Sequence, residues 1–161
     1  MAVVIRVLWL ILAVSSGVLA IFVPPASSQD RQPPRLETFR GKIISVNDRL
    51  KKLGVALDPD AGLHLALETD KGEVLPLLRD SGSLMFFRDN RLLDRPIEAR
   101  ARLLPGTGLL QIISFHALKD GQRFEVFYWC ETCAIKRLYL EKTGVCECCG
   151  GVMELRESPV P

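Results

Sequence analysis

Cysteine is absent from the first 129 residues of this 161-residue chain, and histidine occurs only as His64 and His116. The missing early cysteine excludes a lipid-modified cysteine near the N-terminus. No histidine follows a Cys-x-x-Cys pair, which disfavours covalently bound haem. Two histidines without a nucleophile motif give little support to Ser-His-Asp or Cys-His catalysis. We therefore expect no catalytic residues, and the interpretation leans away from an enzyme.

The chain also lacks a large excess of positively or negatively charged residues. The formal net charge is +2, and it falls to +1 without residues 1–28, whose single charged residue is Arg6. The only adjacent lysines are Lys51 and Lys52. Because binding to a phosphate backbone needs clustered positive charge, a nucleic-acid partner is not expected.

The first 28 residues differ in character from the rest. Residues 7–23 are almost wholly apolar, Arg6 precedes them, and the small residues 26–28 follow. This order is typical of a secretory signal peptide, here cleaved before Gln29. The alternative is an uncleaved anchor, because these apolar residues are at the lower edge of the ~17–25 that span a bilayer. Either way we expect an extracytoplasmic protein, periplasmic or secreted, with membrane contact only through residues 7–23 if they are retained.

Residues 29–35 are interpreted as a linker, and residues 36–127 are predicted to form one β domain. Alternating apolar segments separated by turn residues predict strands at 39–46, 63–68, 73–78, 95–104, 109–117 and 123–129. Two short helices are expected, with Asp48 and Ser83 as their caps. The residues expected to face the core from two of these strands are Leu63, Leu65, Leu67, Ile97, Ala99, Ala101 and Leu103.

This order of strands places the second helix between the third and fourth strands. It resembles the order of an oligonucleotide/oligosaccharide-binding (OB) barrel, whose closure hides strand edges. The fold class predicted for the chain is mainly β, an OB-like antiparallel barrel followed by a small C-terminal cysteine module. An open sheet or a sandwich is the alternative. Many different ligands bind to this barrel, so the fold alone implies no function.

All five cysteines lie in residues 128–157. The pairs Cys130/Cys133 and Cys146/Cys149 are separated by twelve residues. A two-residue spacer lets both sulfurs of a pair face one ion, and two pairs complete a four-thiolate zinc site. We therefore predict a zinc-ribbon-like module at 128–157, with short strands at 135–142 and 152–156. Its Zn²⁺ would be structural, since a four-sulfur shell leaves no position for water or substrate. Residues 158–161 would be a tail.

Cys148 is the surplus thiol, and it is expected to face solvent or to exchange with other sulfurs. Oxidation is the main alternative, because an exported protein meets oxidising conditions. Two disulfides with one free thiol, or a redox-active pair, would use the same five residues. A softer ion such as Cu(I) is a further alternative.

Three other features are candidates for binding. Tyr128 and Trp129 could form a ligand-contact surface for a base or a sugar, although aromatic residues more often seal a seam between domains. Residues 58–62 (Asp-Pro-Asp-Ala-Gly) suggest a calcium loop, but Thr69 occupies the position of its expected glutamate. Both histidines fall in predicted strands, where an ordinary surface role is favoured.

The cysteine motif also carries a family resemblance. Tyr-Trp-Cys-x-x-Cys at 128–133, Cys-x-Cys-Cys-Gly-Gly at 146–151 and Met-Glu-Leu-Arg-Glu at 153–157 resemble a set of exported proteins of planctomycete bacteria. The resemblance extends loosely upstream and covers most of the chain after residue 28. It implies export and a metal-type cysteine cluster, and it implies no activity.

The expected function is that of a binding or scaffolding module in the cell envelope, with an envelope protein or a small ligand as partner. The alternative is an envelope thiol-redox or metal-handling (Cu/Zn) protein in which Cys148 reacts. The two differ in one respect: thiols that hold a structural zinc ion stay inert until a chelator removes it.

Overall fold

A computed structural model describes residues 34–138 and 144–161 of the chain. The predicted signal or anchor at 1–28 and most of the linker at 29–35 lie outside these residues. Among the described residues, no helix is long and apolar enough to cross a membrane.

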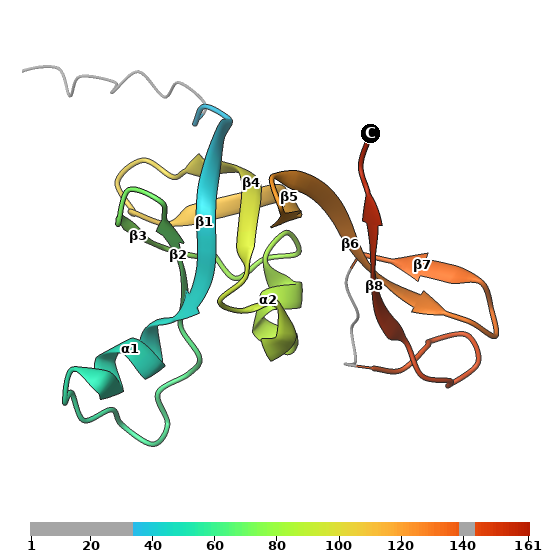
Figure 1. The fold of residues 1–161 in the computed structure, drawn as a ribbon. Helices are drawn as coiled ribbons and strands as arrows, with labels where there is room; N and C mark the ends of the chain where they lie inside the picture. Colours follow the sequence, from blue (N-terminus) through green and yellow to red (C-terminus); the bar gives the residue numbers. More distant parts are fainter. Residues whose placement is uncertain (1–33, 139–143) are drawn as a thin grey trace, which may run out of the picture. The chain divides into compact units, whose positions relative to one another are not determined.

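One antiparallel β-sheet forms most of the described structure (Figure 1), as the alternation predicted. Its order is β3-β2-β1-β4-β5-β6-β7, and β8 pairs with β6 outside this path. β3 and β7 are the first and last strands of this order and do not pair with each other, so the sheet is not closed. The strands are β1 (Glu37–Ser45), β2 (Leu65–Thr69), β3 (Val74–Pro76), β4 (Pro96–Leu103), β5 (Leu110–Lys119), β6 (Gln122–Cys130), β7 (Ile135–Arg137) and β8 (Glu154–Pro159).

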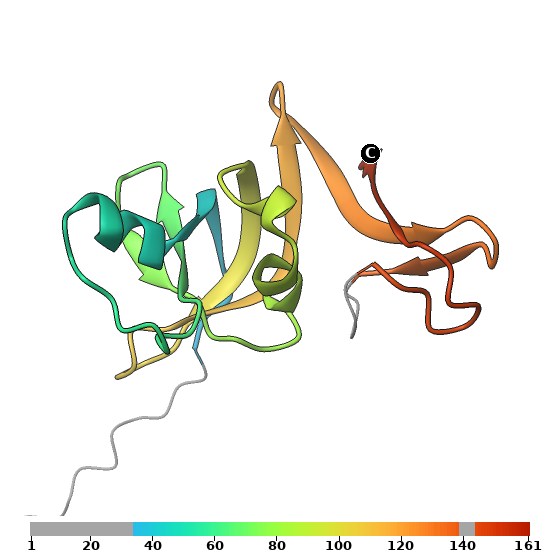
Figure 2. The ribbon, with the colours of Figure 1, turned by 90° about the horizontal axis from the view of Figure 1, so that it is seen from below.

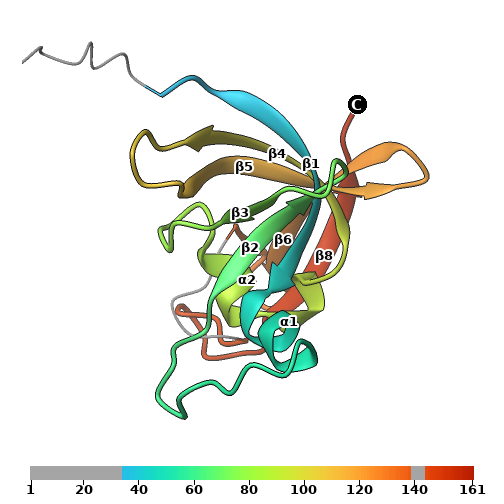
Figure 3. The same ribbon diagram turned by 90° about the vertical axis from the view of Figure 1, so that its left-hand side faces the viewer.

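β1 is the centre of the first half of the sheet, since it pairs with both β2 and β4. Gly41 pairs with Thr69 on one side and with Ile97 on the other. A Cβ atom at Gly41 would lie 2.0 Å from the carbonyl oxygen of Glu68. Glycine therefore permits the close approach of β1 and β2 at this rung. Figure 3 shows β1, β4 and β5 beside one another.

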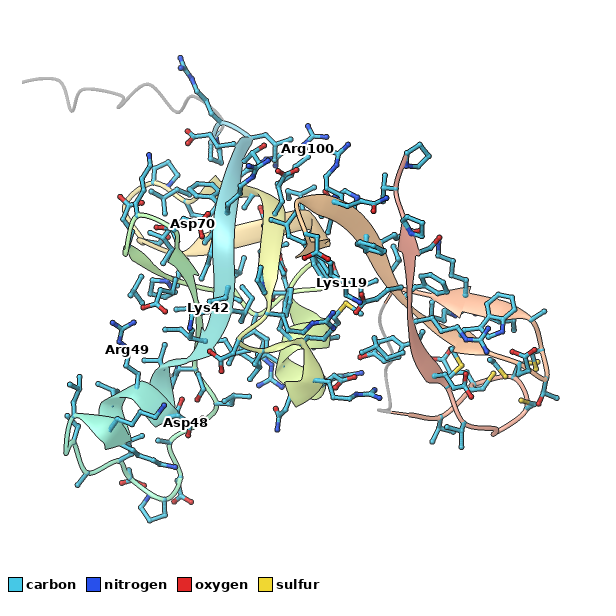
Figure 4. The ribbon with its side chains drawn as sticks, viewed as in Figure 1. Lys42, Asp48, Arg49, Asp70, Arg100 and Lys119 are labelled. Atoms are coloured by element: carbon cyan, nitrogen blue, oxygen red, sulfur yellow. The ribbon has the colours of Figure 1, made fainter. Side chains whose placement is uncertain are left out.

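α1 (Val46–Lys52) follows β1, and its cap differs from the prediction. The N-cap residue is Ser45, whose Oγ accepts a hydrogen bond from the backbone N–H of Asp48 at 3.1 Å. Asp48 lies in the first turn of α1, where its negative charge interacts favourably with the positive end of the helix dipole. The Arg49 guanidinium fixes α1 to the sheet through Glu68 at 2.5 Å, and Lys42 approaches the same carboxylate at 3.6 Å (Figure 4).

α2 (Leu84–Arg88) and the 3-10 helix η1 (Asn90–Leu92) lie between β3 and β4. Ser83 stands at the N-cap of α2, but its side chain makes no capping bond. Its Oγ donates instead to the carbonyl oxygen of Leu78. Ser83 is therefore the N-cap residue, as predicted, but its side chain does not cap the helix. Its fully buried hydroxyl holds the preceding loop instead.

The core contains the inward faces of β2 and β4. Leu65, Leu67, Ile97, Ala99 and Ala101 are buried, as the alternation predicted. Two residues expected in the same faces are instead exposed, Leu63 by 39% and Leu103 by 47%. Leu63 precedes β2 and Leu103 is the last residue of β4, so neither has the neighbours that cover the middle of a strand.

The C-terminal strands are shorter or shifted relative to the prediction. The sequence predicts a strand at 135–142, whereas β7 covers Ile135–Arg137 and residues 139–143 lie outside the described part of the chain. It also predicts a strand at 152–156, whereas β8 covers Glu154–Pro159. β6 is longer than either and pairs with β5, β7 and β8.

Candidate metal centre

The first cysteine pair lies at the end of β6. Cys130 is the last residue of this strand, and it pairs with Ile135 at the start of β7. The connecting turn holds Cys133, and Ala134 directly after it has a φ of 52°. A left-handed residue after the second cysteine reverses the chain so that both sulfurs of the pair lie on its inner side.

The second pair lies in a turn closed by a bridge between Val145 and Val152. Within it, the Cys146 N–H donates to the Gly151 carbonyl and the Gly150 N–H donates to the Cys146 carbonyl, both at 2.8 Å. Gly150 follows the second cysteine with a φ of 70°. Each pair therefore has a residue with positive φ directly after its second cysteine.

The four paired cysteines meet at one point. The sulfur atoms of Cys130, Cys133, Cys146 and Cys149 lie within 4.8 Å of one another, and those of Cys130 and Cys149 are 3.6 Å apart. Four sulfurs at ~2.3 Å from a central ion form a tetrahedron with edges of about 3.8 Å. All five cysteines are free thiols. The cluster therefore fits a metal ion in its donor type, number and spacing.

Burial divides the four sulfurs into two groups. Cys130 and Cys146 are buried and belong to the hydrophobic core, together with Met153. Cys133 is half-buried and Cys149 is exposed. The cluster therefore has one side against the core and one side toward solvent.

Backbone hydrogen bonds favour thiolate at one ligand above the others. The N–H groups of Cys149 and Cys148 donate to the Cys146 sulfur and lower its pKa to about 7. The neighbouring thiols of Cys149 and Cys148 raise the pKa of Cys133. The Gly151 N–H donates to the Cys149 sulfur at 3.4 Å. Because metal ligands must be thiolates, an ion that binds here displaces protons from the remaining thiols.

Cys148 is exposed and does not belong to the four-sulfur group. Its thiol lies close enough to Cys133 to help raise the pKa of that cysteine. The other sequence candidates do not join the cluster either. His64, His116 and Asp58 are absent from the candidate metal group that the described residues form.

Tyr128 belongs to the core and not to a surface. It is 2% exposed, and its hydroxyl donates to the buried carboxylate of Asp89 at 2.9 Å. Arg91 also binds Asp89, with Nη2 at 2.6 Å from Oδ2. The ring of Tyr128 is therefore buried, in keeping with the seam that the sequence favours over a ligand-contact surface. Tyr128 seals the seam between the cysteine module and the loop after α2.

Trp129 lies on the opposite side of the strand and is partly exposed. Its indole Nε1 donates to Glu131 at 2.8 Å, and the Arg156 guanidinium lies 5.6 Å from its ring. Arg156 also pairs with Glu131 at 2.7 Å. One face of the indole is therefore covered by a cation–π contact from within the chain.

A second contact joins β8 to the part of the sheet formed by β4 and β5, and it was not predicted from the sequence. Glu157 of β8 accepts a hydrogen bond from Arg95, just before β4, and forms an ion pair with Lys119 at 2.6 Å. Its carboxylate side chain is 15% exposed. Burial raises the pKa of Glu157, but the two cations outweigh it and hold this pKa below its ordinary value. Asp89 belongs to no motif, and Glu157 belongs only to the segment at 153–157 that carries the family resemblance, which does not predict a buried ion pair.

Comparison with family models, curated proteins and solved structures gives no match to this chain. The functional argument therefore depends on the geometry of the cysteine cluster and of the sheet.

Proposed function

We propose that this chain is an exported protein in which a structural zinc ion organises residues 128–157, and that it acts as a binding or scaffolding module in the cell envelope. The observation that carries this proposal is the meeting of four sulfurs within 4.8 Å from two turns of the same shape. Zinc accounts for this arrangement because about thirty residues cannot build a sufficient hydrophobic core alone.

A structural role for the ion follows from its ligands. Four thiolates fill the tetrahedral shell of zinc, so no position is left for water or substrate. An all-sulfur shell also suits Cu(I), which is the second candidate ion. Disulfides are the third possibility for an exported protein, and they would join the same sulfurs in pairs.

The residues 36–127 are proposed to be an OB-like barrel. Three features support this: the β2-β1-β4-β5 neighbours, α2 between β3 and β4, and a parallel bridge between Leu77 and Leu110. The Leu78 N–H also donates to the Leu110 carbonyl at 2.9 Å. The bridge brings the end of β3 to the start of β5, which is where such a barrel closes.

The proposed compartment depends on residues 1–28 and on the family resemblance. An apolar segment followed by small residues suits export, and the motif at 128–157 resembles that of exported planctomycete proteins. The mass of the mature chain tests this directly, since cleavage before Gln29 removes residues 1–28 and an anchor retains them.

Native mass spectrometry of protein purified from the envelope tests the metal. We expect one zinc ion per chain and one thiol, Cys148, that reacts with iodoacetamide before a chelator is added. Cys149→Ser should lose the ion, whereas the matched variant Cys148→Ser should keep it. A metal-free native protein with its sulfurs joined in disulfides would overturn the proposal.

The second candidate function is metal handling or thiol exchange in the envelope. The observation that favours it is the exposure of both Cys148 and Cys149, which places a spare thiol beside a ligand on the solvent side. A reversible disulfide, or the reaction of a second thiol besides Cys148 in the metal-loaded protein, would support this function over the structural one.

A further inference from the structure

Two arginines of β4 lie on the side of the sheet that faces away from the core. β4 runs between β1 and β5 in the sheet (Figure 2). Its alternate residues Ile97, Ala99 and Ala101 are buried. Because side chains alternate along a strand, Arg100 and Arg102 lie on the outward side. Arg100 is exposed there, and Arg102 is half-buried.

Two further arginines extend this outward surface. Arg40 of β1 and Glu98 of β4 are ladder partners, so they share the outward side. Arg40 binds the Glu98 carboxylate at 2.6 Å, and Arg123 of β6 approaches the same carboxylate at 3.7 Å. We call Arg40, Arg100, Arg102 and Arg123 the arginine face; Figure 4 labels Arg100. With Glu98 its formal charge is +3, whereas the whole chain carries +2.

The described residues do not neutralise the arginine face. Glu98 is shared between Arg40 and Arg123. Arg100 and Arg102 have no hydrogen bond or ion pair to any side chain that the structure describes. The Nε atom of Arg102 is buried, and it also has no hydrogen-bond partner there. A guanidinium carries five N–H donors in a fixed fork, so these two arginines can each bind a further acceptor.

The nearest other acidic residues stand at the border of the arginine face. Glu37 of β1 pairs with the buried Ala101, so it belongs to the other side of the sheet. The Asp70 N–H donates to the Arg40 carbonyl, which places Asp70 at the β2 side of the face. No ion pair joins the side chains of Asp70 and Arg40 within the described residues. The face therefore fits an anionic partner from outside these residues.

The neighbours of the unpaired arginines decide the class of this partner. The ladder partners of Arg100 are Thr38 and Ser114, and the β5 partner of Arg102 is Gln111. All three are polar. Stacking of nucleic-acid bases needs aromatic side chains, and binding to a lipid surface needs exposed apolar ones. The surface around Arg100 and Arg102 offers neither, so its partner is held by charge and hydrogen bonds.

The spacing of the arginines matches an extended polypeptide. Arg100 and Arg102 are two residues apart in one strand, so their Cα atoms are separated by about 6.5–7 Å. Alternate residues of an extended peptide have the same separation and lie on the same side of it. Each guanidinium can bind one carboxylate through two parallel hydrogen bonds. Carboxylates on alternate residues of such a peptide therefore match these two arginines.

We propose that the arginine face binds an extended acidic segment of a partner protein, in which alternate residues are aspartate or glutamate. Arg100 and Arg102 bind two of these carboxylates, and Arg40 and Arg123 add positive charge beside them. The proposal rests on the proposed binding role, for which it names the chemistry of the partner. It does not depend on the metal.

Titration of the purified native protein with peptides, followed by NMR, provides the first test. The probe is acetyl-Ser-Glu-Ser-Glu-Ser-Glu-Ser-amide, and acetyl-Ser-Ser-Glu-Glu-Glu-Ser-Ser-amide is the control of equal composition. We expect the alternating peptide to shift the amide signals of Arg100 and Arg102 with a dissociation constant of about 1 mM or lower. The clustered peptide should bind several-fold more weakly. Added salt should weaken binding, because exposed charges are screened.

Matched variants separate the arginine face from positive charge in general. Arg100→Gln combined with Arg102→Gln should weaken binding of the alternating peptide by about tenfold. Lys51→Gln combined with Lys52→Gln removes the same charge from exposed positions in α1 and should leave binding unchanged. Arg100→Glu should bind the peptide with lysine in place of glutamate more tightly than the wild type does. Misfolding cannot produce that gain, so this variant guards against a trivial loss of structure.

Four results would overturn the proposal. These are no shift at Arg100 and Arg102 with the alternating peptide, equal binding of the two peptides, equal loss in both double variants, and tighter binding of a sulfated oligosaccharide or an oligonucleotide of the same charge. The zinc content of the same sample is measured alongside. A chain with zinc and no peptide binding would refute only the arginine face, while peptide binding by a zinc-free native protein would refute only the metal.

Discussion

Tyr128 lies two residues before Cys130, the first residue of the four-cysteine cluster. Its hydroxyl donates a buried hydrogen bond to Asp89. Asp89 caps η1 through the Arg91 N–H, so the bond joins the loop after α2 to the strand that carries Cys130. Because β6 also belongs to the main sheet, the position of Cys130 is fixed by the body of the protein, with or without an ion in the cluster.

Loss of this hydroxyl should reduce stability without loss of the ion. In Tyr128→Phe, the buried Asp89 keeps Arg91 but loses a donor, which is expected to lower the free energy of unfolding by about 1–2 kcal/mol. Urea denaturation and metal content measure the two effects. Trp129→Phe is the control, since it removes an exposed bond to Glu131 and should cost less. An equal loss in both variants would contradict the role of the Tyr128 hydroxyl.

Acid should weaken the same network. The Arg91 guanidinium, and to a lesser extent the Tyr128 hydroxyl, hold the pKa of Asp89 below its ordinary value of 3.8. Because the folded pKa is depressed, the stabilisation is complete above about pH 5 and is lost as the pH falls through the folded pKa, below 3.8. Unfolding midpoints measured from pH 7 to pH 2 should fall more steeply in the wild type than in Asp89→Asn. Parallel curves would show that Asp89 does not contribute.

The pattern of the chain predicts the strands well, but it does not predict which of their end residues are covered or which residue caps the following helix. Alternation places Ile97, Ala99 and Ala101 in the core because a strand has a period of two, and the structure confirms all three. It cannot predict that Leu103 is exposed, because exposure at a strand end depends on which segments cover it. Likewise, Ser45 and Asp48 are both good caps, and the end of β1 decides between them.

The cluster of four cysteines was predictable from the sequence, and its attachment to the rest of the sheet was not. Two Cys-x-x-Cys pairs define the four sulfurs locally, since each pair is held by its own turn. The bonds that hold the module to the body join residues far apart in sequence, such as Asp89 with Tyr128 and Arg95 with Glu157. Charged residues of this kind resemble ordinary surface residues until a fold buries them, so pattern alone does not identify them.

A glycine in the loop before α2 should be intolerant of substitution. In Gly82→Ala the new Cβ would lie 1.9 Å from the Ile112 carbonyl oxygen, so either the loop or β5 has to move. Overpacking against backbone of this kind costs about 1–3 kcal/mol. Gly62→Ala is the matched control, because a Cβ atom added at Gly62 would have no atom within 4 Å. Thermal unfolding of the two variants should differ, and equal stability would show that the loop is not held against β5.

If the four-cysteine cluster holds an ion as proposed, removal of that ion should unfold the cysteine module before the body. Cys130, Cys146 and Met153 share the core with residues of β1 and β4, whereas Cys133 is half-buried and Cys149 is exposed. Without an ion, the four cysteines lose the metal–sulfur bonds that would hold the two turns together, and contacts between thiols do not replace that stabilisation. Hydrogen exchange after chelation should therefore lose protection in β7 and β8 while β1, β2 and β4 stay protected. If chelation leaves β8 protected, the bonds of Glu157 and the core suffice to hold the module, and the ion has another role.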